Sequence, residues 1–490
     1  MSSLDPRTPV LVGAGAVTQR EEDPAAALEP LTLMAIALER AAEDAGDPAL
    51  LARAGLVAIT RGFWDQPDPG RWLAQRFGAP RARTLMAEIG VLQTSPIGRA
   101  CREIAAGRVD VALVAGGEAR ARSQRALRAG GEATMTRLPA READTVLRPA
   151  VDILGRLEIE RGLAMPVGQY AMIENALRFA EGQPVAAHRQ AVAELWSRMS
   201  EVAATNPDAW HPERVAPEAI RDAGPRNRML AFPYTKRHNS QWNVDQAAGL
   251  LFCSAAAAES LGVPRDRWIF PLSIAESNFM LPLTERRALH RSPGFRAAGA
   301  AALRRAGRTM DEVRHRELYS CFPSAVRVQA RELEIDERES LSVTGGMAFA
   351  GGPLNNFVLQ ALVRMVRVLR DDPGSAGLVT AVSGMLTKQG VSLWSSAPPG
   401  GAFHFDDVSD EAEAATGRVE VVADAAGAAR VASYTVLHAD PAPTAVVLAD
   451  LPDGRRTLVQ SGDPELVAAG EEDELCGRAI VLAEGRARLV

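Results

Sequence analysis

Residues 97–119, IGRACREIAAGRVDVALVAGGEA, decide the fold class, because two kinds of hydrophobic pattern meet within them. The first half has apolar residues at helical spacing and predicts a helix that ends at Gly107, a residue type common just after helices. The run from Val109 onward is apolar without alternation, which is typical of a strand buried on both faces. A helix followed at once by such a strand predicts a parallel sheet covered by helices.

The same order of elements occurs elsewhere in the chain, and then a second time. An apolar strand at 9–17, a helical pattern at 31–46 and a second strand at 56–62 open the chain. After Pro264, strands and helices follow again in the same order, beginning with WIFPLSIAES at 268–277. Two halves of similar order predict a pseudo-twofold, double α/β architecture rather than a solenoid, whose period would be far shorter.

Residues from about 118 to 235 interrupt the first half with Arg-rich and Ala-rich helices and long loops. A segment inserted at the carboxyl ends of a parallel sheet faces the crevice where α/β folds bind ligands. We therefore expect an N-terminal half at 1–263, which contains this inserted loop domain, and a C-terminal half at 264–405.

The last part of the chain, 406–490, is predicted to be a separate small domain. After a Pro-Gly-rich linker near Pro398, short strands follow one another, the first of them RVEVVA at 418–423, with an Asp-Gly turn at 453–454. Strands at this spacing predict a small β-barrel of the OB type, although a β-sandwich of the same size has a similar pattern.

The composition favours a soluble protein with a small-molecule partner. The 490 residues are 47% hydrophobic and 24% charged, which is typical of a globular protein with more than one core. The net charge of −6 is small, and no block of Lys or Arg marks a surface for nucleic acid or for an anionic membrane. There is neither a run of about 18 apolar residues nor a signal peptide, so we expect a cytoplasmic protein.

The cysteines and histidines are not spaced for disulfides or for a metal site. The four cysteines lie far apart without a Cys-x-x-Cys pair, and the seven histidines are scattered, so we predict no metal and no bound cofactor. Other common motifs fail as well. VGAGAV at 12–17 is followed by Thr18 where a dinucleotide fingerprint needs its third glycine, and neither a G-x-S-x-G elbow nor a P-loop occurs.

With the duplication and the inserted segment in view, the chain resembles the thiolase superfamily over about residues 5–400. The stretch 97–119 is similar to the thiolase segment after the nucleophile, where a helix, a glycine, a buried strand and a GGxE turn follow in this order. NVDQAAGLLFCSAAAAESLGV at 243–263 is similar to the segment in which an acidic residue and small residues lead into a core strand. The resemblance implies a duplicated, five-layered αβαβα fold, with coenzyme A (CoA) or an acyl-CoA thioester as the ligand.

The residues that thiolase chemistry requires are missing from their expected positions. Thiolases carry a nucleophilic cysteine where a helix N-terminus favours the thiolate, and counting back from Gly107 places that position near Val91. The family's GHP histidine is Gly352 here, and its CxG cysteine is absent near Gly384. Condensation and thiolysis need a thiolate and a second group that moves a proton. The chain therefore resembles a thiolase-like subfamily without the nucleophile and with an additional C-terminal domain.

Three residues are candidates for a different chemistry. Tyr319 replaces the Asn or His of the family's NEAF or HDCF motif, and a phenol there could act as acid or base, although it could also be a strand-end tyrosine packed under the inserted segment. Cys321 matches the cysteine of HDCF, which is not the nucleophile in those relatives, and we expect it to be buried. Gln389 lies in the loop that replaces CxG and could face the pocket.

Five residues are candidates for ligand binding because they lie at or beside these motifs. Gly351 and Gly352 precede a helix whose free N–H groups could bind a carbonyl oxygen, or they could simply allow close packing. Asn355 could face the ligand or cap that helix, and Lys388 could face the pocket or be solvated. The set comprises Val91, Gly351, Gly352, Asn355 and Lys388.

Basic residues at the start of the inserted segment could also contact the ligand. In thiolases this segment carries basic residues toward the nucleotide end of CoA, so the resemblance implies such a role. The residues here are Arg120, Arg122, Arg125 and Arg128, whose spacing is also typical of a solvated helix face.

The leading hypothesis is a thiolase-fold protein that binds CoA or an acyl-CoA thioester between its halves without thiolase activity. A second is an acyl-CoA retro-aldolase that uses Tyr319, because thiolase relatives that act as aldolases use tyrosines and pair with a separate OB-fold protein. A third is a non-catalytic interaction protein that docks a partner on its barrel. We also expect a homodimer, since thiolases pair through the N-terminal half, unless the extra domain blocks that surface.

Overall fold

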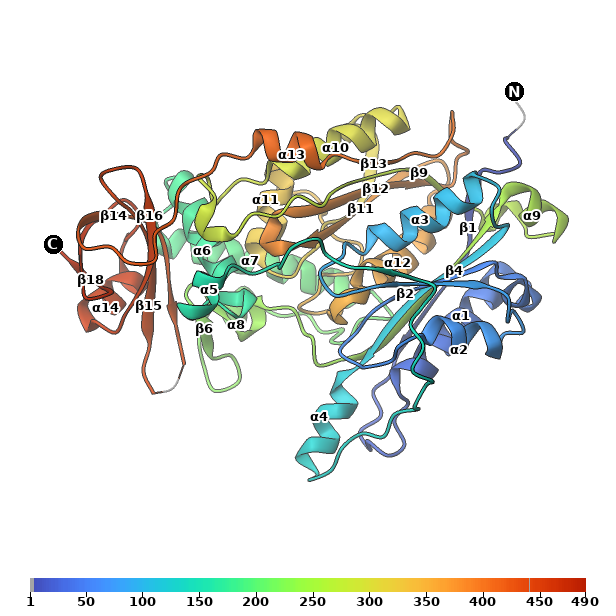
Figure 1. Ribbon diagram of the computed structural model, residues 1–490, viewed down its shortest axis with the longest axis horizontal. Helices are drawn as coiled ribbons and strands as arrows, with labels where there is room; N and C mark the ends of the chain where they lie inside the picture. The colour runs from blue at the N-terminus through green and yellow to red at the C-terminus, as the bar shows by residue number, and fades with distance from the viewer. Residues whose placement is uncertain (1–3, 440) are drawn as a thin grey trace.

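The computed structural model describes residues 4–439 and 441–490 and shows two α/β halves with a smaller third part at one end (Figure 1). The first half is built on a six-stranded sheet in the order β1-β8-β4-β2-β3-β5. β4 and β8 are buried along their whole length, as their apolar sequences predicted. The strands are β1 (Pro9–Thr18), β2 (Leu56–Thr60), β3 (Arg83–Ala87), β4 (Val111–Ala119), β5 (Thr145–Leu147) and β8 (Asp245–Ser254).

The second half repeats the arrangement of the first. In each sheet the strand that opens the half pairs antiparallel with a later strand, which pairs antiparallel with a third, and the third has a parallel neighbour. The matching series are β1-β8-β4-β2 and β9-β12-β11-β10, so the internal duplication is confirmed. A short strand, β13, pairs with β9, and the predicted boundary at 405 falls within it. The strands are β9 (Phe270–Ser277), β10 (Val313–Glu317), β11 (Ala376–Ser383), β12 (Lys388–Ser395) and β13 (Phe405–Asp407).

Helices form three further layers around these two sheets. α1 and α2 cover the outer face of the first sheet, and α10 covers the outer face of the second. α3 and α12 lie between the sheets, since each contacts strands of both. α12 is buried around most of its circumference, as a helix in the middle of five layers must be. The expected αβαβα fold is thus confirmed, with α1 (Pro30–Ala45), α2 (Pro69–Arg76), α3 (Thr94–Ala105), α10 (Pro293–Ala306), α11 (Pro323–Glu332) and α12 (Phe357–Asp371).

The segment between β4 and β8 forms helices joined by long loops, as predicted. α4 projects from the body of the molecule (Figure 1), and α6 lies between α11 of the second half and β14 of the C-terminal part. One short strand of the segment, β5, runs parallel to β3 and covers its outer edge. The other elements are α4 (Arg120–Arg128), α5 (Arg156–Glu160), α6 (Pro166–Ala180), α7 (Val185–Ala203), α8 (Pro217–Arg221), β6 (Met229–Ala231) and β7 (Tyr234–Thr235).

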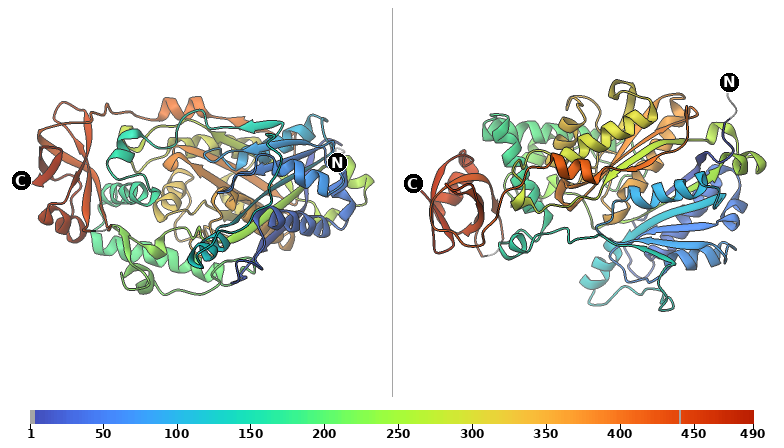
Figure 2. Two further views of the ribbon diagram at one scale, coloured as in Figure 1. Left: turned by 60° about the horizontal axis from the view of Figure 1, so that its bottom comes forward. Right: turned by 45° about the horizontal axis from the view of Figure 1, so that its top comes forward.

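The C-terminal part is a curled antiparallel sheet in the order β16-β15-β14-β17-β18 (Figure 2). Ser461 Oγ at the end of β16 donates a hydrogen bond to the carbonyl oxygen of Ala487 in β18 (2.8 Å), so the two outer strands meet and the sheet resembles a small barrel. β6 of the inserted segment pairs with β14 and joins the two parts. The elements are α13 (Ser409–Ala415), β14 (Gly427–Leu437), β15 (Thr444–Asp450), β16 (Arg456–Ser461), α14 (Pro464–Glu472), β17 (Ala479–Ala483) and β18 (Arg486–Leu489).

The strand predicted at 418–423 does not form. These residues make only two isolated bridges, one to Arg286 and one to Arg456, because they run between the second half and the barrel and have no continuous partner strand. The remaining elements are α9 (Ala255–Ser260) and the short 3-10 helices η1 (Pro48–Arg53), η2 (Lys236–His238), η3 (Arg265–Arg267), η4 (Leu283–Glu285), η5 (Met310–Glu312), η6 (Leu354–Asn356) and η7 (Gly384–Leu386).

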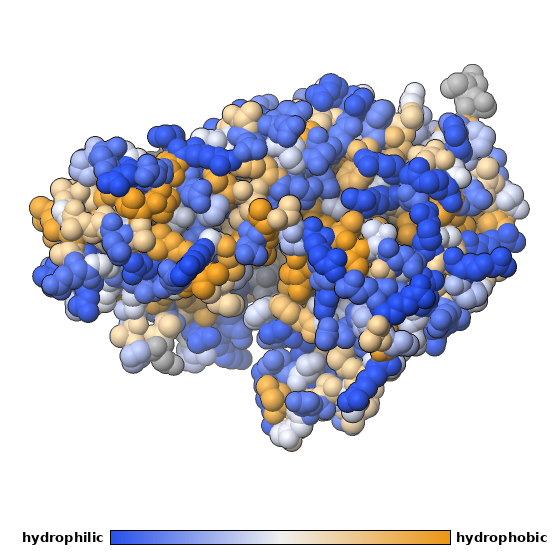
Figure 3. All heavy atoms as spheres, viewed as in Figure 1, coloured by the Kyte–Doolittle hydropathy of each residue, from blue (hydrophilic) through white to orange (hydrophobic). Residues whose placement is uncertain are grey.

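Hydrophilic side chains cover most of the face shown in Figure 3, with apolar ones between them. Near the middle of this face, beside α5, the surface is hollowed and apolar side chains border the hollow (Figure 3). Every helix within residues 4–439 and 441–490 is too short or too polar to cross a lipid bilayer.

Candidate functional site

The N-terminal ends of the two central helices meet where the two halves join. Gln93, the residue before α3, accepts a hydrogen bond from the backbone N–H of Val358 in the first turn of α12 (2.7 Å). The Gln93 amide nitrogen lies 3.4 Å from the carbonyl oxygen of Leu354 in η6. One side chain of the first half therefore caps the helix of the second, and both helix starts border the same place.

Several of the candidate residues keep a small accessible surface at this place. Tyr319 is 8% exposed and Cys321 9%, whereas Leu318 and Ser320 have no exposed surface. Val91 and Asn355 are each 8% exposed. These residues come from both halves, and each is at most 9% exposed, so solvent reaches little of their surface.

Tyr319 lies just beyond the end of β10 and is held firmly. Its N–H donates to Thr380 Oγ1 (2.8 Å), its carbonyl oxygen accepts from Gln329 Nε2 (2.8 Å), and its ring lies edge-on to Phe357. Burial raises the pKa of Tyr319 well above its ordinary value, and contact with the Gln93 side chain offsets only part of the rise. The phenol is therefore protonated at neutral pH, and it can donate a hydrogen bond or a proton but cannot act as a base.

Cys321 is buried, as the sequence predicted, and lies beside a tyrosine of the inserted segment. Burial raises the pKa of Cys321 to about 12, and the side chain of Tyr170 on α6 is within hydrogen-bonding reach. The Tyr170 ring stacks on Phe322 with 4.5 Å between ring centroids. A thiol in these surroundings stays protonated, so it is a poor nucleophile.

The loop before α12 differs from its sequence-based description in one respect. The N–H of Gly352, expected to be free for a ligand, donates to the carbonyl oxygen of Gln241 (2.8 Å), because the inserted segment returns along this loop. Gly351 has φ of +103°, and a side chain there would collide with Gln246, so close packing explains this glycine. Asn355 does not cap α12, and its Nδ2 points instead toward the carbonyl oxygen of Ala87 (3.4 Å).

Lys388 and Gln389, adjacent in β12, project from opposite faces of the second sheet, because side chains alternate along a strand. The amide of Gln389 donates to Ser292 Oγ (2.7 Å) and lies against Gly294 in α10 on the outer face. Gln389 is therefore not at the site, and its predicted role is wrong. Lys388 lies on the inner face, where its Nζ donates to the carbonyl oxygen of Gly90 (2.5 Å), so it is not a solvated loop lysine.

The turn that stands near the expected CxG position is strained. Gly384, Met385 and Leu386 have φ of 55°, 49° and 73°, a conformation that side-chain-bearing residues rarely adopt. The buried guanidinium of Arg286 holds this turn by donating to the carbonyl oxygens of Gly384 (3.0 Å) and Met385 (2.5 Å). The carbonyl oxygen of Arg286 in turn accepts from Arg456 of the C-terminal part (2.6 Å), so the barrel supports the turn.

Glu276 is a buried group at the site that the sequence interpretation missed. Its carboxylate accepts hydrogen bonds from Thr94 Oγ1 (3.0 Å) and Ser95 Oγ (2.8 Å) in the first turn of α3, and from Asn278 Nδ2 (3.1 Å). Burial raises the pKa of Glu276, and these hydrogen bonds lower it. A single acidic residue in the largely apolar run FPLSIAES was the one available signal.

The arginines at the start of the inserted segment form internal contacts rather than a solvated helix face. Arg120 lies between Phe63 and Trp242, with its guanidinium carbon 4.6 Å and 4.1 Å from the two ring centroids. Arg122 is buried, and Arg125 pairs with Asp245 (3.3 Å). Arg128 remains exposed.

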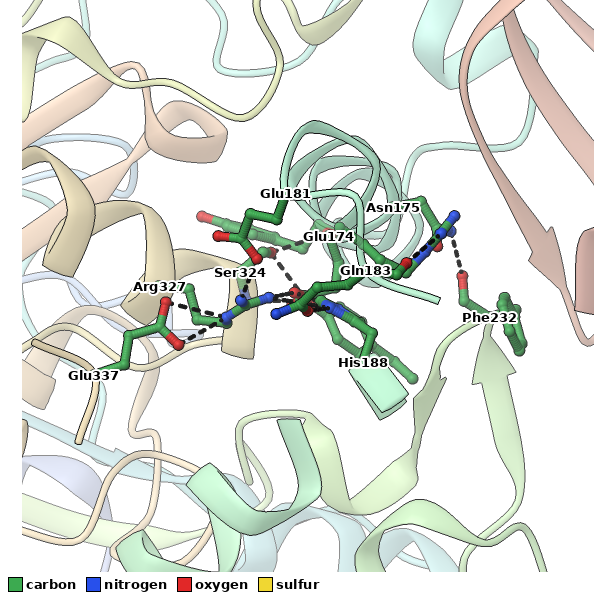
Figure 4. A network of polar contacts seen from close by, with 12 residues as sticks. Glu174, Asn175, Glu181, Gln183, His188, Phe232, Ser324, Arg327 and Glu337 are labelled. Carbon is green, nitrogen blue, oxygen red and sulfur yellow. Dashed lines mark hydrogen bonds and ion pairs between the residues drawn. The ribbon is translucent and has the colours of Figure 1, made fainter. Parts of the chain in front are cut away.

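A buried polar network fixes the inserted segment onto the second half (Figure 4). Arg327 of α11 pairs with Glu174 of α6 (2.8 Å), Glu181 (2.8 Å) and Glu337 (3.0 Å). His188 of α7 contacts the same Glu174 (2.9 Å). Since Tyr170 lies on α6 as well, this network determines where Tyr170 stands relative to Cys321.

Two cavities within the described residues differ in size and place, and neither is a preformed pocket of useful size at the two helix starts. One cavity lined by Gly351, Phe357 and Gln360 has a volume of about 10 Å³, close to the least that a water molecule needs. A cavity of about 550 Å³ opens on the surface around Asp311, Arg314 and other charged residues, away from the site. Within the described residues, no three His, Cys, Asp or Glu side chains are grouped closely enough to hold a metal ion.

No protein-family model matches the chain, and no curated protein sequence matches it. Among solved structures, a monomeric SCP2-thiolase-like protein type 1 from Mycobacterium smegmatis is 30% identical, with 100% of both chains covered and a TM-score of 0.83. An Ltp2-ChsH2(DUF35) aldolase is 18% identical over 80% of this chain and 99% of that chain, with a TM-score of 0.61. An acetyl-CoA acetyltransferase from Syntrophomonas wolfei is 19% identical over 80% of this chain and 100% of that chain, with a TM-score of 0.58.

The two more distant structures support the thiolase fold alone. The match to the M. smegmatis protein is of another kind, because it runs the whole length of the chain and so takes in the inserted segment and the C-terminal sheet. The chain therefore belongs to the family of SCP2-thiolase-like proteins within the thiolase superfamily.

Proposed function

We propose that the protein binds CoA or acyl-CoA thioesters between its two halves, in the cytoplasm, without conventional thiolase activity. The observation that carries the proposal is which residues lie at the site. Val91 and Gln93 lie just before α3, where a thiolase needs a cysteine. The thiol of Cys321 has its pKa raised to about 12 by burial, so it cannot supply a thiolate at neutral pH. The site therefore has no thiolate that could hold the acyl group as a thioester on the enzyme.

Binding of such a ligand requires movement at the site. Val91, Tyr319, Cys321 and Asn355 are each at most 9% exposed, while pockets that hold drug-sized ligands usually measure roughly 300–1,000 Å³. The hydrogen bond of Gln93 across the two helix starts is the contact most directly in the way. We expect the Gln93 side chain and the inserted segment to shift when a thioester enters.

Calorimetric titration tests this function. The purified chain is titrated with CoA, acetyl-CoA and a long-chain acyl-CoA, and thioester content is measured in the same samples. Saturable heat without loss of thioester supports the proposal. Turnover of acetyl-CoA to acetoacetyl-CoA would contradict the absence of thiolase activity, and a lack of binding to all three ligands would exclude the proposed function altogether.

A retro-aldolase activity is the second candidate, and the observation in its favour is the protonated phenol of Tyr319 beside the Tyr170 hydroxyl and the Cys321 thiol. In this reaction a base takes the proton of the 3-hydroxyl group, the C2–C3 bond breaks to give a carbonyl compound and the enolate of a shorter acyl-CoA, and an acid protonates that enolate at carbon. Tyr319 would be the acid, and a second group would have to be the base. The variant Tyr319→Phe would then lose turnover while keeping its affinity for the ligand. Turnover by that variant at the rate of the natural chain would remove Tyr319 from the mechanism.

Docking of a partner on the barrel receives less support. Asn175 Nδ2 of α6 donates to the carbonyl oxygen of Tyr434 (3.0 Å), and Ser433 Oγ donates to that of Met172 (2.6 Å), so α6 covers the middle of β14. β6 pairs with the end of the same strand. This side of the barrel is thus engaged within the chain, and we propose that the barrel supports the ligand site rather than recruits another protein.

A further inference from the structure

Lysine is exceptionally rare in this chain, and one of its lysines is buried at the candidate site. Of the 55 Lys and Arg residues, only Lys236 and Lys388 are lysines. Lys236 is exposed, whereas Lys388 is 3% exposed. A buried Lys is unusual unless its charge has a partner. In a chain that uses Arg almost everywhere, a Lys at this position points to a need for a compact ammonium, which a planar guanidinium does not meet.

The fold brings the ammonium of Lys388 to the place counted for the thiolase nucleophile. Nζ donates to the carbonyl oxygen of Gly90, the residue directly before Val91 (2.5 Å). Ser383 Oγ donates to the same oxygen (3.2 Å). The cation therefore comes from the second half but stands beside the start of α3 in the first.

A glycine allows this arrangement. Gly390 is two residues from Lys388 on the same face of β12 and pairs with Glu276 of β9. A Cβ at Gly390 would lie 2.4 Å from Thr94 Oγ1, so only a glycine lets the first turn of α3 settle onto the sheet. α3 thus begins between a buried cation and a buried carboxyl group, Lys388 and Glu276.

Lys388 has hydrogen-bonding capacity beyond its bond to Gly90. An ammonium carries three N–H donors and no acceptor. Burial lowers the pKa of Lys388, while the nearby Glu276 raises it, and the carboxylate thus helps to keep the amine charged. A charged donor in such surroundings binds a carbonyl oxygen more strongly than a neutral donor does. The difference grows when negative charge develops on that oxygen.

We propose that Lys388 binds the carbonyl oxygen of an acyl thioester next to Val91 and so makes the site select acyl-CoA over free CoA. The inference rests on the proposed function and adds the residue that recognises the acyl carbonyl of the ligand. It assigns to Lys388 the donor role that the Gly352 N–H cannot fill, since that N–H is bonded to Gln241.

The test compares two ligands that differ only in the carbonyl. Acetyl-CoA and S-ethyl-CoA, its thioether analogue, are titrated into the full-length chain, with CoA as the reference. We expect acetyl-CoA to bind about tenfold or more tightly than S-ethyl-CoA, as a hydrogen bond to a charged group allows. In the variant Lys388→Met this preference disappears while affinity for CoA is kept, and Lys236→Met, at the exposed lysine, leaves all three affinities unchanged.

A second measurement follows the unaltered chain and does not depend on a Lys388 variant that folds. With lysine labelled in ¹³C and ¹⁵N, the chain gives two lysine side-chain signals, and Lys236→Arg assigns them by removing one. Acetyl-CoA should shift the Lys388 signal more than S-ethyl-CoA does and leave that of Lys236 in place. Equal affinities and equal shifts for the two ligands would overturn the role of Lys388 while CoA binding stands. No binding of CoA or of either analogue would overturn this inference together with the proposed function.

Discussion

Substitution of Gly390 by Ala tests how the two halves are joined at the candidate site. The added Cβ would lie 2.4 Å from Thr94 Oγ1 and 3.0 Å from Thr94 Cγ2, against roughly 3.4–4 Å for an ordinary contact. Rotation of the Thr94 side chain does not relieve both collisions, and it breaks the hydrogen bond to Glu276. Overpacking of this kind costs about 1–3 kcal/mol. We expect Gly390→Ala to lower the free energy of unfolding by that amount.

The double variant Gly390→Ala with Thr94→Ala separates this collision from other causes. Thr94→Ala removes Oγ1 and Cγ2 and leaves only its Cβ, 3.2 Å from the added methyl group. By itself it costs the hydrogen bond to Glu276, about 1 kcal/mol. Because it also makes room, the double variant should be more stable than the sum of the two single effects by about 1 kcal/mol or more. Urea midpoints of the four proteins measure this. Strictly additive effects on stability, or a Gly390→Ala variant as stable as the unaltered chain, would show that α3 does not pack on β12 as described.

Three further predictions concern the pH dependence, the oligomeric state and the C-terminal part. Burial raises the pKa of Glu118 from 4.5 to about 7, so the folded chain holds a proton that the unfolded chain releases. The contribution of this proton to stability is full below about pH 4.5 and is lost as the pH rises to about 7. The variant Glu118→Gln should remove this pH dependence, so its urea midpoints at pH 5 and pH 8 should differ less than those of the unaltered chain. Because β5 covers the outer edge of β3, we predict a monomer of 52.2 kDa in light scattering after gel filtration, rather than the homodimer that the resemblance to thiolases implies. A mass near twice that value would contradict the blocked edge. Truncation after residue 415 exposes the buried face of α6, so the shortened chain should be insoluble; a soluble, monodisperse product would show that the barrel is dispensable.

The parts of the fold that the sequence predicts are those set by local hydrophobic pattern. The apolar runs that became β4 and β8 are buried over their whole length, and the helix expected at 31–46 is α1 at Pro30–Ala45. Repetition of the same strand and helix order then indicated two similar halves. The run at 418–423 shows the limit of the method, because its alternation is that of a strand but no partner strand lies beside it.

The residues of the site are harder to predict, because their roles depend on pairings between distant segments. Whether Lys388 or Gln389 faces α3 follows from the register of β12 against β9, which sequence alone does not give. The N–H of Gly352 is bonded to Gln241, more than a hundred positions earlier in the chain. Glu276 stands out in the sequence only as an acidic residue in an apolar strand, and its partners Thr94 and Ser95 belong to the other half.

The joining of β6 and α6 to β14 has a consequence for the order in which the chain folds during its synthesis. Asn175 and Tyr434, which are hydrogen-bonded, are 259 positions apart, so α6 leaves the ribosome long before the strand that covers it exists. At ordinary rates of translation of roughly 5–20 residues per second, the interval is about 10–50 seconds. Throughout that time the inserted segment displays an apolar face that only the last part of the chain can cover. We therefore expect the nascent protein to need protection from aggregation until its C-terminal part is made.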